Sequence, residues 1–127
     1  MKFGAAIGLT MILFTAPALA DGDAAKGEEV FKKCRACHEV GEGAKAKVGP
    51  VLNGVIGRTA GTSEGFTQYS EAMKEAGAGG LVWNEETLSQ YLANPKQFVS
   101  KNKMAFAGLK KDDDIADVIA YLKQFSQ

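Results

Sequence analysis

The apolar and polar positions along the chain predict helices joined by long loops. Residues 112–114 are acidic and suit the first turn of a helix. Apolar residues then recur at the spacing of one helix face, at Ile115, Val118, Ile119 and Leu122. Residues 23–34 predict another helix, with Asp23 as its N-cap. Gly27 is a poor helix former inside that run, which indicates that another helix approaches closely there.

Two shorter helices are predicted in the middle of the chain, and no strand pattern of comparable length appears. Residues 69–76 suit a short helix that ends at a glycine-rich run, and Asn84 suits the cap of the next helix. That helix must stop before Pro95, because a proline restricts the residue that precedes it. Residues 41–65 and 98–108 have the composition of loops. Loops of this length in a compact domain need something to wrap around, so we expect an all-α fold around a bulky centre.

Residues 1–20 have the layout of a secretory signal peptide. Lys2 supplies a positive start, residues 3–14 are mostly apolar, and Ala18-Leu19-Ala20 is a small-x-small cleavage site. The chain turns polar at once after Ala20. We therefore expect cleavage there, export to the periplasm, and one mature domain over residues 21–127. The alternative is an N-terminal anchor that is retained.

Composition and charge narrow the class of protein. The chain has 15 basic and 15 acidic residues, so it lacks the strong basic excess that non-specific nucleic-acid binding requires. Its only cysteines, Cys34 and Cys37, would close too small a loop to restrain much of the chain. A domain this small usually needs extra stabilisation beyond its own core, and a bound cofactor would provide it.

The pentapeptide Cys34-Arg35-Ala36-Cys37-His38 is the pattern of c-type haem attachment. Two thiols at this spacing reach the two vinyl groups of one porphyrin, and the adjacent histidine is then held against the iron. Three alternatives are weaker. A thioredoxin-like site needs a βαβ context, and a zinc site needs about four ligands. A structural disulfide would leave His38 without a role. We therefore expect one covalent haem c with His38 as an iron ligand.

The sixth iron ligand is methionine, another group or nothing, because His38 is the only histidine. Met73 lies in a predicted helix among charged residues, where a structural methionine is expected. Met104 lies in a loop and can approach the haem from the opposite face. A thioether ligand favours ferrous over ferric iron and so raises the reduction potential. The spacing favours Met104 over Met73.

The series of short motifs resembles the class I c-type cytochromes, the family of mitochondrial cytochrome c and bacterial cytochrome c2. The resemblance covers essentially the whole mature chain. The matching segments are 33–38, 48–50, 57–58, Trp83 with 85–88, 91–96, 103–108 and 119–122. It implies the small cytochrome c fold, with short helices and long loops wrapped around one covalently bound haem. It also implies that the N- and C-terminal helices cross where Gly27 meets Tyr121.

The resemblance implies roles for single residues near the iron. Met104 becomes the sixth ligand, and Tyr91 lies beside its sulfur. The Pro50 carbonyl accepts a hydrogen bond from the ring nitrogen of His38 that does not bind iron, which fixes the tautomer.

Further residues are implied as hydrogen-bond donors to the haem propionates. Arg58, Tyr69 and Trp83 have this role by resemblance, because buried propionate charge needs partners. Asn102 stands where the family often has threonine, and it is a candidate to replace that residue as a propionate donor.

The expected function is that of a soluble periplasmic electron carrier and not of an enzyme. By resemblance, a cytochrome bc complex donates the electron, and a photosynthetic reaction centre, a terminal oxidase or a peroxidase accepts it. The carrier would be a monomer that touches membrane complexes transiently and binds no nucleic acid. Lysines near the haem edge would dock acidic partners, namely Lys33, Lys47, Lys96 and Lys103. The alternatives are a five-coordinate haem enzyme or gas-binding protein, and a haem domain bound permanently to an enzyme.

Overall fold

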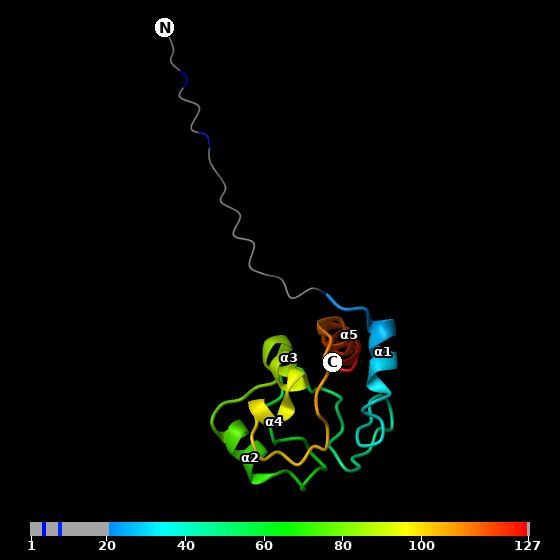
Figure 1. Ribbon diagram of the computed structural model, residues 1–127, viewed down its shortest axis with the longest axis vertical. Helices are drawn as coiled ribbons and strands as arrows, with labels where there is room; N and C mark the ends of the chain where they lie inside the picture. Colours follow the sequence, from blue (N-terminus) through cyan, green and yellow to red (C-terminus); the bar gives the residue numbers. More distant parts are fainter. Residues whose placement is uncertain (1–3, 5–7, 9–20, 127) are drawn as a thin grey trace.

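The computed structural model describes residues 4, 8 and 21–126 and shows an all-α fold (Figure 1). Its helices are α1 (Ala24–Phe31), α2 (Glu71–Ala78), α3 (Glu85–Ala93), α4 (Pro95–Phe98) and α5 (Asp112–Lys123). One isolated antiparallel bridge joins Thr59 to Val82. In the part of the chain described, no helix has the length and apolar character to cross a membrane. The predicted signal peptide, residues 1–20, lies outside the described residues except for positions 4 and 8.

The first and last helices cross in close contact, as the sequence predicted. Figure 1 shows α1 beside α5, although they lie at opposite ends of the domain's sequence. A Cβ atom on Gly27 would overlap the carbonyl oxygen of Asp117 and would lie 2.8 Å from the Cβ of Tyr121. The ring centroids of Phe31 and Tyr121 are 5.4 Å apart. The helices can approach this closely only because Gly27 has no side chain.

Local capping residues start α1 and α3 where the sequence placed them. The Asp23 side chain accepts a hydrogen bond from the Lys26 N–H at 3.1 Å, and its own N–H donates to Asp117 Oδ1 at 2.8 Å. Asn84 and Thr87 form a reciprocal capping box at the start of α3. These bonds satisfy backbone donors that the first helical turn leaves without partners.

The helix boundaries differ from the prediction in three places. Helix α1 ends at Phe31, three residues before Cys34, because the chain turns there to form the attachment segment. Helix α2 begins at Glu71, after the N-cap Ser70, and ends at Ala78. Helix α4 was not predicted. Its N-cap is Asn94, which is also the C-cap of α3. Pro95 is its first residue, where a helix has no hydrogen-bond partner for the N–H that proline lacks.

The core joins α1, α3 and α5, and loop residues extend it towards α2 and α4. Trp83, Tyr91 of α3 and Phe98 of α4 form an aromatic group within it, with the Trp83 and Tyr91 rings 4.9 Å apart. Half-buried apolar side chains from the loops pack against the same core, among them Leu52, Ile56, Met104 and Phe106. The loops therefore contribute much of the apolar surface of this domain.

We expect the Gly27→Ala variant to be less stable than the parent by about 2 kcal/mol or more. Alanine would gain about 1 kcal/mol in helix propensity, but its methyl group would overlap the backbone of α5. Gly79→Ala is the matched control, since a Cβ there meets its nearest atom, the Glu75 oxygen, at 3.4 Å. Denaturant midpoints measure both variants. Equal midpoints would show that the crossing has room for a side chain.

Candidate functional site

The two cysteines lie in a tight turn directly after α1. The Cys37 N–H and the His38 N–H both donate to the Cys34 carbonyl, at 3.1 and 2.9 Å. Both thiols are free and half-buried. Burial raises the pKa of the Cys34 thiol, and the neighbouring Cys37 raises it further. The turn therefore presents two thiols on one short segment, with the imidazole directly after them.

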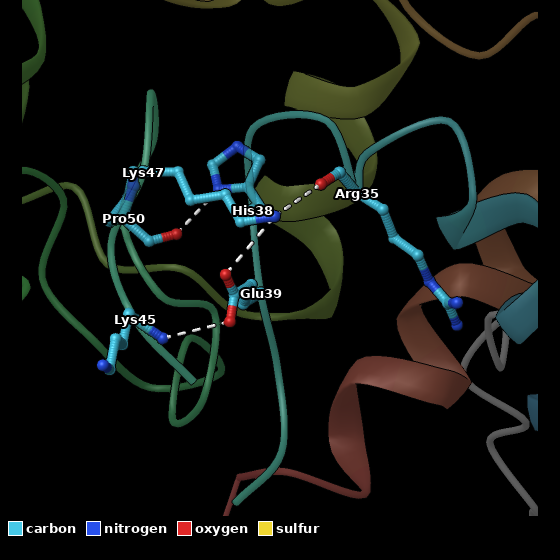
Figure 2. Close-up of polar contacts among 6 residues, drawn as sticks. All are labelled: Arg35, His38, Glu39, Lys45, Lys47 and Pro50. Atoms are coloured by element: carbon cyan, nitrogen blue, oxygen red, sulfur yellow. Dashed lines mark hydrogen bonds and ion pairs between the residues drawn. The ribbon is translucent and has the colours of Figure 1, made fainter. Parts of the chain in front are cut away.

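His38 is held in a defined orientation by the loop that follows it (Figure 2). Its Nδ1 lies 2.7 Å from the Pro50 carbonyl oxygen. Because a carbonyl only accepts, Nδ1 must carry the proton, and the Nε2 lone pair of the neutral ring is left available. Burial lowers the pKa of His38, and the Arg58 charge lowers it further against the opposing effect of the Pro50 carbonyl. Gly49 packs so closely that a side chain there would collide with the ring.

Lys47 contacts the attachment turn through its ammonium group. Its Nζ lies 3.3 Å from the Arg35 carbonyl oxygen and 3.3 Å from Glu39 Oε2. The Lys45 N–H donates to the other carboxylate oxygen of Glu39 at 3.3 Å. Figure 2 shows the Lys47 side chain running past His38 to Arg35 and Glu39. Lys47 was predicted only as a docking residue, and the structure shows that it also bonds to the turn.

Met104 lies next to a buried hydroxyl group. The Tyr91 O–H points to the Met104 sulfur at 3.8 Å, and the sulfur-bearing side chain is half-buried. Burial raises the pKa of Tyr91 to about 12, so the phenol is a neutral donor at physiological pH. Met73 instead lies in α2, where its backbone N–H donates to the Ser70 side chain. The contact between Tyr91 and Met104 is present, and the ligand role of Met104 stays a prediction.

The three predicted propionate donors, Arg58, Tyr69 and Trp83, differ in their contacts. Arg58 Nη1 donates to the Val51 and Asn53 carbonyls at 3.2 and 3.3 Å, which leaves other guanidinium N–H groups for an anion. The Tyr69 oxygen accepts the Ser63 N–H at 3.1 Å and keeps its own proton to donate. Trp83 is buried, with 6% of its surface exposed.

The expectation that Asn102 donates to a propionate is wrong. Asn102 is buried, and its amide nitrogen donates to the carbonyls of Pro95 and Val99, both at 2.9 Å. Those two bonds use both amide N–H groups. The sequence position was read as a substitute for threonine, whereas the longer amide side chain reaches backward to α4.

This set of donors fits a covalently bound haem. His38 offers a neutral imidazole nitrogen, Met104 a soft thioether, and Cys34 and Cys37 two thiols at the spacing of the porphyrin vinyl groups. Half-buried apolar side chains suit a porphyrin face, and Arg58 suits its carboxylates. Sequence reasoning missed the contacts of Lys47 and Glu39 and the packing of Gly49 on His38. Only the Gly49-Pro50 pair in a quoted motif pointed towards them.

Comparisons with known proteins agree with this chemistry. The cytochrome c family model matches residues 24–126. Cytochrome c2 of Agrobacterium tumefaciens is 55% identical over 102 residues, which cover 80% of this chain and 91% of the relative. Cytochrome c-550 of Ancylobacter novellus is 60% identical over 102 residues, covering 80% and 94%.

The fold has equally similar neighbours among solved structures. Cytochrome c2 from Rhodospirillum centenum matches with a TM-score of 0.79 and 48% identity, over 84% of this chain and all of that one (100%). The agreement extends over the whole domain, from the turn that holds the cysteines to the C-terminal helix. The chain therefore belongs to the cytochrome c family, and it is an electron-carrying haem protein with one covalently attached haem c.

Proposed function

We propose that this protein is a diffusible periplasmic carrier whose haem has both axial positions filled, by His38 and Met104. The observation that carries the proposal is the placement of two suitable donors by separate, partly buried contacts. Pro50 fixes the His38 tautomer at 2.7 Å, and Tyr91 lies 3.8 Å from the Met104 sulfur. Two filled positions leave no open site for oxygen or peroxide, which distinguishes electron transfer from oxygen activation.

Each residue of the site then has a physical task. The haem, when bound, supplies iron that alternates between the ferric and ferrous states. Cys34 and Cys37 bind it covalently, and the neutral His38 imidazole binds the iron through Nε2. The Tyr91 hydroxyl donates to the neutral thioether and limits the movement of its sulfur.

A five-coordinate haem enzyme or gas-binding protein is the second candidate in principle. It would require that Met104 does not bind iron. The structure gives Met104 a buried hydrogen-bonding neighbour and places it against the apolar core. We therefore propose a carrier without enzymatic activity.

The proposed location rests on residues 1–20, and the proposed partners rest on the family to which the chain belongs. We propose that residues 1–20 are a signal peptide cleaved after Ala20, and the family match from residue 24 supports a fold that begins after it. The electron would come from a cytochrome bc complex and pass to a reaction centre, an oxidase or a peroxidase.

The proposed docking lysines differ in their contacts. In residues 21–126, Lys33 and Lys103 are exposed and form no ion pair. Lys47 pairs with Glu39, and Lys96 bonds to Asn102. Lys33 is therefore a good test of docking, because its replacement breaks no ion pair among the described residues.

We expect the Met104→Ala variant to lose the weak near-infrared sulfur-to-iron band of the ferric protein. Its reduction potential should fall, and cyanide or azide should bind readily, because alanine cannot replace the thioether. Met73→Ala is the control and should keep the band and the potential. Absorption spectra, potentiometry and ligand titrations measure these effects. If the two variants exchanged behaviour, Met73 would be the ligand.

We expect Lys33→Glu to slow association with a cytochrome bc complex roughly threefold to tenfold at low salt. The loss should shrink as ionic strength rises, because a screening length of about 10 Å in 0.1 M salt leaves only nearby charges effective. Lys123→Glu is the control, since Lys123 lies on α5 and pairs with Glu85. Stopped-flow rates at several salt concentrations measure both. Equal effects would contradict a docking face near the haem.

A further inference from the structure

We propose that Asn102 is the positioning residue that holds Met104 in place to bind iron. The inference rests on the proposed function, in which Met104 is the sixth ligand. It concerns the Met104 loop, defined as residues 99–109, which connects α4 to the approach to α5. Asn102 does not touch the iron in this proposal and acts only through the backbone of Met104.

Asn102 joins both ends of α4 to Met104 through a single side chain. Its amide nitrogen donates to the Pro95 and Val99 carbonyls at 2.9 Å each, and its Oδ1 accepts the Met104 N–H at 2.8 Å. Asn102 is only 5% exposed, so water competes little for these groups. Three bonds from one buried amide therefore fix where the Met104 backbone lies relative to α4.

Lys96 completes the contact from the surface. Its Nζ donates to the Asn102 carbonyl oxygen at 2.5 Å and lies 3.3 Å from Asn102 Oδ1. The Lys96 charge orients the side-chain oxygen of Asn102, which also accepts the hydrogen bond from the Met104 N–H. A charge-assisted hydrogen bond is stronger than a neutral one, so this lysine supports the position of the side chain.

Lys101 shows that the loop is held against its local preference. With φ of 65°, it is the one non-glycine residue with positive φ in the described part of the chain. A side chain in this conformation costs on the order of 1 kcal/mol, and it persists when neighbouring contacts demand it. The Asn102 bonds directly after Lys101 are those contacts. Without these bonds, the loop would lower its free energy by leaving the conformation that Lys101 adopts.

The far end of the loop is fixed independently. The Leu109 N–H donates to the Leu92 carbonyl at 2.8 Å, and Gly108 packs against the Ala93 backbone too closely to admit a side chain. Met104 thus lies between two attachments, to α4 and to α3. Loss of Asn102 should free one of them and leave the helices in place.

Asn102→Ala in the haem-loaded protein tests the proposal, with Asn53→Ala as the matched control. Asn53 also uses its amide on the backbone of another loop, at 2.7 and 2.8 Å from Gly41, but it has no bond to Met104. For Asn102→Ala we expect cyanide affinity of the ferric protein to rise roughly tenfold or more. The sulfur-to-iron band should also disappear at a lower denaturant concentration than the helical circular dichroism signal. For Asn53→Ala, the sulfur-to-iron band and the helical circular dichroism signal should disappear at the same denaturant concentration. Its cyanide affinity should stay within about twofold of the parent.

The results separate this inference from the proposed function. If the parent has the sulfur-to-iron band and Asn102→Ala behaves like Asn53→Ala, the positioning role is overturned and the ligand assignment stands. If the parent lacks the band and Met104→Ala does not differ from it, the ligand assignment fails and the positioning role fails with it.

If Asn102→Ala does not fold, Asn102→Asp against Asn53→Asp repeats the comparison. Each aspartate keeps the shape but places an oxygen against backbone carbonyls. A several-fold rise in cyanide affinity in Asn102→Asp alone supports the role, and equal affinities overturn it.

Discussion

The crossing of α1 and α5 at Gly27 is the contact on which the rest of the structure depends. It brings the two ends of the domain together with backbone against backbone, and Asp23 adds a bond to Asp117 from the start of α1. Helix α1 ends at Phe31, whose ring packs on Tyr121, and the cysteine turn follows at once. The position of α1 therefore sets the position of both thiols and of His38. An error in the crossing would move the whole attachment segment.

Side chains that bond to backbone hold several of the loops in place. Asn53 bonds to Gly41, Lys47 bonds to the Arg35 carbonyl, and Asn102 bonds to α4. Each of these bonds replaces a backbone partner that a helix or sheet would otherwise supply. In a small domain with little core, this makes a few polar residues as important to the loop geometry as apolar ones are to the helices.

Features that depend on nearby residues could be predicted from the sequence, and those that depend on distant contacts could not. Asp23 and Asn84 were identified as caps because a cap bonds within three residues. Helix α4 was missed because its 4 residues are too few to show a period. The motif order led to the proposal of Met104 as the iron ligand opposite His38. The role of Asn102 was misread, because a motif position does not reveal which way a longer side chain turns.

Lys96 shows how one residue can serve both the fold and the proposed docking face. Its bond to the Asn102 carbonyl depends on direction and acts only over 2.5 Å. Electrostatic attraction of an acidic partner depends on the location of the charge and acts over about 10 Å at 0.1 M salt. The ammonium group keeps its charge when it donates to a neutral carbonyl, so the structural bond does not weaken the long-range attraction. A carboxylate partner would have neutralised that attraction, and Lys47, which pairs with Glu39, is the example within this chain. Among the lysines of the proposed docking face, one bonded to a neutral carbonyl would therefore attract an acidic partner more strongly than one paired with a carboxylate.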